Sequence, residues 1–179
     1  MHETAELNLV PTQVNPREIE PSKKSRAVAP GEKHVLFKLG GETFCLPACK
    51  VRGVMGVGSL IPAVNQSFLL IGFVFCQAKA LPVFDIRTPL GLPTPNRGGK
   101  EEVLVLSLPS DARFRMGILV ESLESATEIH PASIRSIPHG KIPQQFLRGS
   151  ALLNGREVLA LDLDFLISPA ALRRLSTIG

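Results

Sequence analysis

One segment of this chain occurs twice, and this repetition limits the folds that the chain can adopt. Residues 72–87 align without a gap with residues 149–164. Each copy reads as a glycine, an apolar run, a short polar turn, a second apolar run and an aspartate. Glycine at a strand entry allows a sharp bend, and aspartate at a strand exit can accept hydrogen bonds from backbone N–H groups. We therefore expect structural turn or capping roles for Gly72, Asp85, Gly149 and Asp162.

The repeat extends to the organisation of the two halves of the chain. A further hairpin pattern precedes each copy, at residues 35–46 in the first half and 103–120 in the second. A half of about seventy residues is too small to cover both faces of its own strands, so the halves should pack as two linked lobes. The Pro- and Gly-rich residues 91–99 mark the seam. This predicts subdomains at about 34–92 and about 101–168.

Short β-type segments bounded by turn residues fill most of the chain after residue 33. Gly-Gly at 40–41 and Asn-Gly at 154–155 are hairpin turn signals. Many short strands at this spacing indicate an all-β barrel or sandwich. Ser168 followed by Pro169 is typical of a helix start, so a short C-terminal helix is expected at 169–179. The predicted strands are 35–39, 43–46, 69–75, 80–86, 103–108, 114–120, 122–129, 151–153 and 157–163.

The N-terminal residues 1–33 have the composition of a flexible tail. They contain several prolines, equal numbers of acidic and basic side chains, and no periodic apolar pattern. The first residues carry acids where a secretory signal has an apolar segment, and no apolar run approaches the ~20 residues of a membrane span. Three cysteines without an export signal favour reduced thiols. We therefore expect a cytoplasmic protein that does not insert into a membrane.

The aromatic content argues against binding of sugars or single-stranded nucleic acid. The chain has nine Phe but no Trp or Tyr, the rings with a polar group that such surfaces usually employ. The net charge of +4 is spread along residues 34–179 and forms no basic stripe. Arg113 and Arg115 alternate with apolar residues, as on the solvent face of a strand. We expect no nucleic-acid partner.

No sequence motif indicates catalysis, a cofactor or a metal. The chain lacks a phosphate-binding loop, a nucleophile elbow and an H-E-x-x-H pair, and the Gly-rich residues 53–58 lack dinucleotide-binding spacing. Cys45 and Cys49 have no second cysteine pair nearby, which favours buried thiols over metal ligands. The expectation that remains is a surface that binds protein partners. Val51, Val54 and Val57 recur every third residue through the connector that we expect after the first hairpin. A valine that faces outward would form an apolar floor beside the turn that carries Gln77.

An ordered set of motifs closely resembles CheW-like chemotaxis adaptor domains over residues 34–168. The resemblance implies two five-stranded SH3/OB-like β-barrel subdomains around a hydrophobic junction, with no cofactor and no catalysis. It also implies a scaffold that couples the cytoplasmic tips of chemoreceptors to the regulatory domain of a CheA-type histidine kinase, with recruitment to membrane receptor arrays. The motifs are LFKLGGETFCLP at 36–47, IG at 71–72, LPVFDIR at 81–87, MGILVESL at 116–123, FLRG at 146–149 and LALDLDFL at 159–166.

Two positions depart from the family pattern. Gln77 occupies the place of an arginine that contacts partners in the family, and Gly53 occupies the place of an acidic residue. The departures indicate a divergent adaptor with altered partners, or a paralogue that has lost the function. An alternative from another class is a small-barrel module that binds nucleic acid or a ligand, and an enzyme ranks third. The expected partner interface comprises Val51, Gly53, Val54, Phe75, Gln77 and Lys79.

Overall fold

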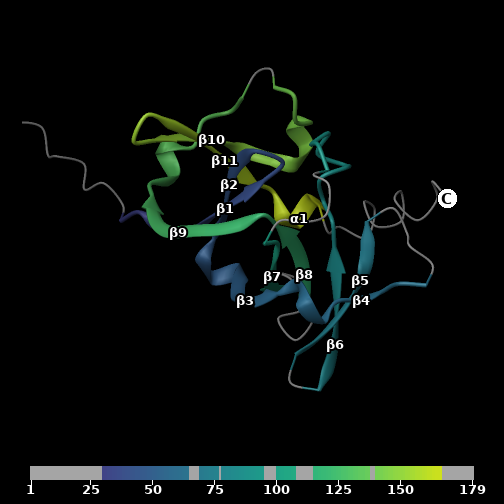
Figure 1. Cartoon of the computed structure of the whole chain (residues 1–179). Helices are drawn as coiled ribbons and strands as arrows, with labels where there is room; N and C mark the ends of the chain where they lie inside the picture. The colour runs from purple at the N-terminus through teal and green to yellow at the C-terminus, as the bar shows by residue number, and fades with distance from the viewer. Residues whose placement is uncertain are drawn as a thin grey trace, which may run out of the picture.

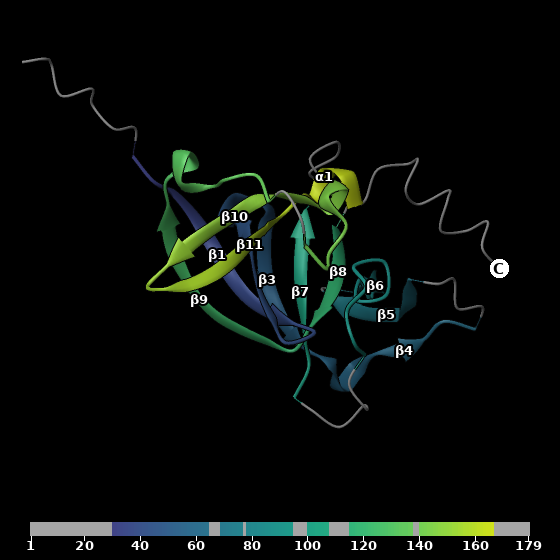
Figure 2. The same ribbon diagram turned by 90° about the horizontal axis from the view of Figure 1, so that it is seen from above.

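A computed structural model describes residues 30–64, 69–76, 78–94, 100–107, 115–137 and 140–166 (Figure 1). Most of the expected N-terminal tail, the expected helix at 169–179 and Gln77 lie outside these residues. The first strand begins at Glu32, two residues before the predicted start of the folded part. The described fold is all-β with two sheets, which confirms the expected fold class (Figure 2).

The five-stranded sheet has the order β10–β11–β2–β1–β9, and the six-stranded sheet has the order β3–β7–β8–β6–β5–β4. Within the described ranges, four 3₁₀ helices and one short α-helix connect or follow the strands. The elements in chain order are β1 (Glu32–Leu39), β2 (Glu42–Pro47), η1 (Ala48–Lys50), β3 (Val51–Gly56), η2 (Val57–Ser59), β4 (Ile61–Pro62), β5 (Leu70–Cys76), β6 (Lys79–Phe84), β7 (Glu102–Ser107), β8 (Arg115–Val120), β9 (Ser122–Ile129), η3 (Pro131–Ser133), η4 (Gln144–Phe146), β10 (Leu147–Leu153), β11 (Arg156–Leu161) and α1 (Leu163–Leu166).

The two halves of the chain exchange hairpins, so neither sheet is formed by one half alone. The first hairpin, β1–β2, pairs with β11 and β9 of the second half, and the β7–β8 hairpin pairs with β6 and β3 of the first half. Each sheet contains one parallel pairing between the halves. Strand β11 pairs with β2, where Ala160 lies beside Cys45, and β6 pairs with β8, where Val83 lies beside Gly117. The expected division into 34–92 and 101–168 therefore does not describe the sheets, because a cut at the seam would divide both.

The internal repeat is reproduced in the backbone. A β-bulge precedes Gly72 in β5 and Gly149 in β10. A Cβ atom at Gly72 would lie 2.3 Å from the Ile61 carbonyl oxygen, and one at Gly149 would lie 2.4 Å from the Arg135 carbonyl oxygen. Both positions thus need glycine because another segment crosses the strand closely. Gly149 also has φ +148°, which side chains rarely allow.

The two aspartates of the repeat occupy matching places at the strand exits. The Asp85 backbone N–H donates to Leu69 O, and that of Asp162 donates to Phe146 O. The Asp85 carboxylate accepts a hydrogen bond from the Arg87 backbone N–H at 3.0 Å, and the Asp162 carboxylate accepts one from the Phe165 N–H at 3.1 Å. Each side chain therefore orders the turn that follows its hairpin.

Three clusters of buried apolar residues hold the fold together. One is confined to the five-stranded sheet and its connections, and one to the six-stranded sheet. The largest contains side chains from both sheets, including Phe37 and Phe44, whose rings stack at 5.9 Å, and Leu104 and Ile118. This cluster, the junction core, fixes the two sheets against each other. It corresponds to the hydrophobic junction that the resemblance implies.

Four elements differ from the sequence expectation. Strand β10 begins at Leu147, four residues before the strand predicted at 151–153. Residues 51–56 form strand β3, although the valine spacing and the glycines indicated a connector. The two-residue strand β4 was not expected. The last predicted strand ends at Leu161, and the following residues turn into α1 because Asp162 caps that turn.

Candidate partner-docking surface

The outer face of the β5–β6 hairpin is apolar and exposed. Along β5, Val74 points into the sheet's own core and is fully buried, whereas its neighbours Phe73 and Phe75 alternate to the other face. Phe75 is 55% exposed and lies directly opposite Ala80 of β6. An exposed phenylalanine leaves a large apolar area in water.

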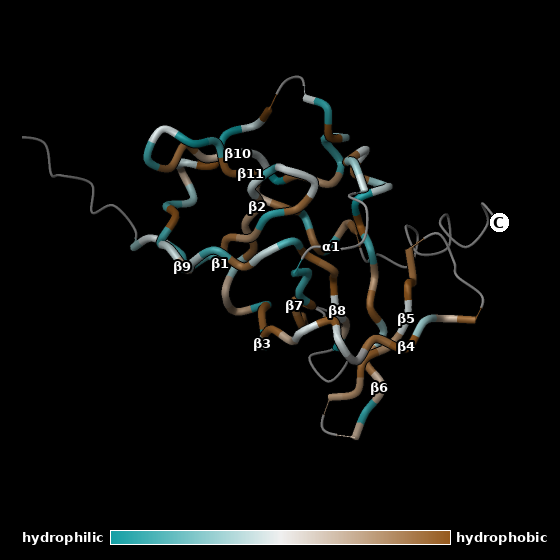
Figure 3. Tube along the Cα trace, in the orientation of Figure 1, coloured by the Kyte–Doolittle hydropathy of each residue, from teal (hydrophilic) through white to brown (hydrophobic). Residues whose placement is uncertain are grey.

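Strand β4 extends this apolar face by one strand. Ile61, which is 53% exposed, pairs with Phe73, and Phe73 pairs on its other side with Pro82. Figure 3 shows β4 and β5 coloured largely as hydrophobic. We call this surface the apolar strip, and its residues are Ile61, Phe73, Phe75, Ala80 and Pro82. Ile61, Phe75 and Ala80 are exposed, and Phe73 and Pro82 are half-buried between them. An apolar surface of this kind is typical of a site that binds another protein.

The structure places the predicted interface residues in two groups. Val51, Gly53 and Val54 lie on β3, which pairs with β7. Phe75 and Lys79 lie on the β5–β6 hairpin at the other end of the strand order, so no strand pairing joins the two groups. Gln77 lies outside the described residues.

Strand β3 presents one valine outward. Val54 is 38% exposed, whereas Val51 packs against the junction core and Val57 packs against the core of the six-stranded sheet. A Cβ atom at Gly53 would meet no other atom within 4 Å. Nothing inside the described fold therefore requires glycine at this position, and a partner could approach the backbone closely here.

A buried ion triad lies beneath the six-stranded sheet at the end of β6. The Arg87 side chain is only 3% exposed and forms ion pairs with Asp85 at 2.7 Å and with Glu101 at 2.9 Å. Burial alone would lower the pKa of Arg87, but hydrogen bonds and charge from Asp85 and Glu101 raise it above the ordinary value. The triad ties the turn after β6 to the start of β7 and is a structural feature.

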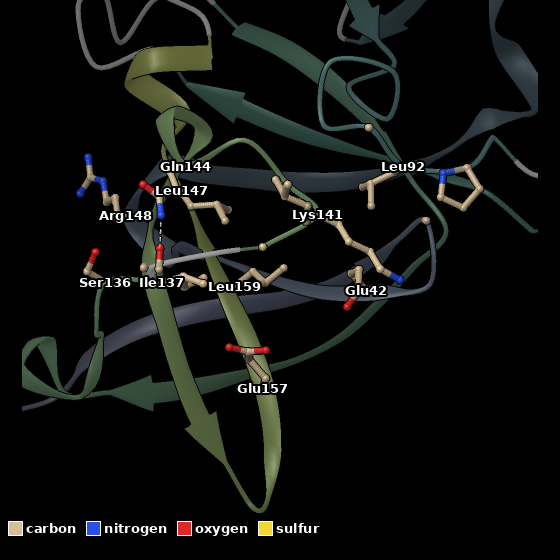
Figure 4. A pocket seen from close by; sticks show the side chains of 16 residues that line it. Glu42, Leu92, Ser136, Ile137, Lys141, Gln144, Leu147, Arg148, Glu157 and Leu159 are labelled. Carbon is tan, nitrogen blue, oxygen red and sulfur yellow. Dashed lines mark hydrogen bonds between the residues drawn. The ribbon is translucent and has the colours of Figure 1, made fainter.

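A pocket of about 520 Å³ lies elsewhere, on the five-stranded sheet (Figure 4). Leu92, Leu147 and Leu159 supply apolar lining, and Lys141 and Glu157 supply charges. Gln144 closes one side, where its amide donates a hydrogen bond to the Ile137 carbonyl oxygen. None of the interface residues predicted from the sequence lines this pocket.

The described residues contain no constellation suited to metal binding. No group of three or more His, Cys, Asp and Glu side chains is close enough to share an ion within the described ranges. Cys45 is buried in the five-stranded sheet, and burial raises its thiol pKa to about 12, so the thiol stays neutral. Among the same residues, no helix has the length and apolar character needed to cross a bilayer.

Sequence reasoning missed two exposed residues that the structure brings into view. Ile61 borders the predicted connector, and its two-residue strand carries no periodic signal. Leu152 is 72% exposed at the position of β10 that the ungapped repeat aligns with Phe75 of β5. The alignment itself was the available signal, because it places an apolar residue three positions after the glycine in both hairpins.

Comparisons with known proteins agree with the sequence resemblance. A family described as "CheW-like domain" matches residues 33–171. Two relatives named "Chemotaxis protein CheW" are each 21% identical: the protein of Rhizobium meliloti over 75% of this chain and 86% of its own length, and that of Klebsiella aerogenes over 77% and 82%.

A solved structure supports the same fold. The scaffolding protein TtCheW from Thermoanaerobacter tengcongensis superposes with a TM-score of 0.69 at 20% identity, covering 79% of this chain and 90% of that one. The family match covers well over half of the chain and includes all the described strands apart from the first residue of β1. This protein therefore belongs to the CheW-like domain family.

Proposed function

We propose that this protein is a non-enzymatic adaptor in chemotaxis or related motility signalling, which couples chemoreceptors to a CheA-type histidine kinase. Family membership supports the adaptor class, since the matched relatives are named as chemotaxis proteins and the matched structure as a scaffolding protein. The proposed location is the cytoplasm, with recruitment to membrane receptor arrays through the partners.

The observation that carries the proposal is the apolar strip. Its exposed phenylalanine, Phe75, has more than half of its surface in water although the chain buries a large core elsewhere. We expect a partner held with micromolar affinity, as is usual for a transient signalling contact of standard size or below. The regulatory domain of the kinase is the proposed occupant, and the receptor tip is proposed to contact the β3 residues Val51, Gly53 and Val54 together with Gln77.

The direct test is binding of the purified chain to the regulatory domain of the CheA-type kinase encoded in the same genome, measured by isothermal titration calorimetry. We expect a dissociation constant in the micromolar range, roughly 1–50 μM. Phe75→Ser should weaken binding at least about tenfold by removing a buried aromatic contact. Leu123→Ser is the matched control, because Leu123 is an exposed apolar residue on β9, in the other sheet.

Absence of binding by the unmodified chain at tens of micromolar would contradict the kinase assignment. Equal weakening by Phe75→Ser and Leu123→Ser would contradict the assignment of the strip to the interface. A separate titration with a receptor-tip peptide addresses the departures from the family pattern. Gln77→Arg should strengthen that binding by restoring a charged, forked donor. If the affinity does not rise, the difference from the family's binding lies at another position.

A further inference from the structure

The pocket on the five-stranded sheet has an apolar floor that is continuous with the junction core. Leu159 of β11 is a member of that core, and Leu92 and Leu147 pack against it. Figure 4 shows these three side chains along the pocket, whose volume is about 520 Å³. This volume and this apolar lining are typical of sites that bind small molecules. None of the described lining residues is aromatic, so the floor suits an aliphatic group better than a ring that would stack.

The walls of the pocket come from segments that are far apart in the sequence and are fixed by hydrogen bonds. In the seam, the Leu92 backbone N–H donates to the Arg87 carbonyl oxygen at 2.9 Å. In the turn between β1 and β2, the Gly40 backbone N–H donates to the Glu121 carboxylate at 2.8 Å. The pocket is therefore formed before any ligand arrives, which lowers the entropic cost of binding.

Two carboxylates line the pocket on neighbouring strands. The parallel register places Leu159 of β11 beside Phe44 of β2, and residues two positions apart in a strand share a face. Glu157 and Glu42, each two positions earlier, therefore lie on the same face as that pair, and both are exposed. Neither forms an ion pair with another residue of the described ranges. Both negative charges are available to a ligand.

The two cations of the lining differ in what they contact. Arg148 pairs with Asp164 at 2.7 Å and with Asp162 at 3.9 Å, and Lys50 also pairs with Asp164 at 2.9 Å. This group of two cations and two carboxylates is neutral as a whole.

Lys141 is the second cation of the lining, and it forms no ion pair within the described ranges. The charges that remain in the lining are thus two carboxylates, Glu42 and Glu157, against one ammonium group. The pocket has an excess of negative charge, which favours a cationic ligand.

The equivalent hairpin of the other sheet indicates that the hairpin fold does not require a carboxylate at position 157. The internal repeat aligns Glu157 with Ala80, which occupies the corresponding place in β6. The first hairpin forms with a methyl group where the second hairpin carries a charge. Glu157 is therefore free to serve a ligand.

We propose that this pocket binds a small organic cation, which consists of an ammonium or guanidinium group on an aliphatic stem. The stem contacts Leu92, Leu147 and Leu159, and the cationic group binds Glu42 and Glu157 through charge-assisted hydrogen bonds. An anion fits less well, because only Lys141 would attract it. The inference is independent of the proposed adaptor function, since none of the interface residues predicted from the sequence lines the pocket.

The experiment titrates the full chain with three probes that share one stem and differ in charge: hexylammonium, 1-hexanol and hexanoate. Isothermal titration calorimetry gives the affinity, and the amide NMR signals of Leu92, Leu147 and Leu159 report the site. We expect hexylammonium to bind with a dissociation constant of about 1 mM or below and 1-hexanol to bind at least about fivefold more weakly. Hexanoate should bind more weakly still.

Substitutions of the lining charges test the sign of the ligand. Glu42→Gln and Glu157→Gln should each weaken hexylammonium binding about three- to tenfold, whereas Lys141→Gln should strengthen it by removing a like charge. Glu128→Gln is the matched control, because Glu128 is an exposed glutamate on β9 of the same sheet and does not line the pocket. Thermal melting by circular dichroism verifies that each variant is folded.

Three results would overturn the inference. One is the absence of hexylammonium binding at about 10 mM. Another is hexanoate binding as tight as that of hexylammonium, or binding that Glu42→Gln and Glu157→Gln leave unchanged. The third concerns the source of the cation: if the peptide acetyl-Leu-Lys-Leu-amide binds more than about tenfold tighter than hexylammonium, the occupant is a side chain of a partner protein and not a small molecule. Kinase binding by the unmodified chain tests the adaptor function separately.

Discussion

The Arg87 guanidinium lies in the interior of the protein. In the described part of the chain, the carboxylates of Asp85 and Glu101 balance its charge. Its hydrogen bonds to Asp85 use Nε and one terminal nitrogen, and the other terminal nitrogen donates to Glu101 at 2.9 Å. This forked geometry is one that lysine cannot reproduce. The side chain links Asp85, which precedes the seam at residues 91–99, to Glu101, which follows it. The last residue of the LPVFDIR motif therefore has a structural role.

Removal of this arginine should destabilise the protein strongly. Arg87→Met leaves Asp85 and Glu101, which are 16% and 15% exposed, without their cation, and we expect a loss of about 3–5 kcal/mol in the free energy of unfolding. Urea denaturation followed by circular dichroism provides the measurement. Arg148→Met is the control, because the ion pairs of Arg148 are nearly half exposed and should be worth at most about 1 kcal/mol. Equal losses for the two variants would refute the structural role of the triad.

Cys45 predicts a pH dependence of stability. Its pKa rises from 9.0 to about 12 because burial disfavours the thiolate. A group with a raised pKa in the folded state stabilises the fold fully below its unfolded pKa, and this contribution is lost as the pH rises toward the folded pKa. The free energy of unfolding should therefore decline between pH 9 and pH 12. Cys45→Ala should reduce that decline, and an unchanged slope would contradict the assignment.

At the scale of elements, the repeat was readable from the sequence because glycine and aspartate mark its hairpins. The strands of both hairpins were predicted near their observed places. Strand β3 was missed because Gly53 and Gly56 interrupt the apolar pattern, and pairing with β7 overrides their low strand propensity. The apolar character of Phe75 was readable, but the contribution of Ile61 depends on a two-residue strand that only tertiary pairing creates.

The bulge glycines allow a sharp comparison between a glycine that the fold needs and one that it does not. Gly149→Ala forces a Cβ atom within 2.4 Å of the Arg135 carbonyl oxygen, so β10 must shift, and we expect a loss of about 2–4 kcal/mol. Gly53→Ala meets open space and should change stability by less than about 0.5 kcal/mol. Thermal and urea unfolding of the two variants provide the measurement. Similar losses at both positions would contradict the crossing at Gly149.

At the scale of the whole molecule, the hairpin exchange could not be inferred from the repeat. The alignment of residues 72–87 with 149–164 does not depend on how the first hairpin of each half pairs. It is the same whether β1–β2 and β7–β8 pair within their own halves or with the other half. The pairings across the halves decide between these arrangements: β11 with β2 and β9 with β1 in one sheet, and β6 with β8 and β3 with β7 in the other. The sequence therefore predicted two lobes and a junction, but assigned the lobes to the wrong strands.

The exchange predicts that neither half folds alone. A fragment of residues 30–94 lacks β7 and β8, and a fragment of residues 100–179 lacks β1 and β2. We expect each fragment alone to show no cooperative unfolding transition, and the equimolar mixture to recover β-sheet circular dichroism and a single transition. Fragments joined in the opposite order by a short linker serve as the control for correct pairing. A cooperative transition in either isolated fragment would contradict this prediction.

The single residue Glu121 connects β8 of one sheet to β9 of the other, and its carboxylate accepts hydrogen bonds from the Gly40 and Gly41 backbone N–H groups. Together with the exchanged hairpins, this short connection gives the molecule a distinctive mechanical property. We expect a stiff coupling between the two sheets, because a connection of one residue and a shared junction core leave little room for a hinge between them.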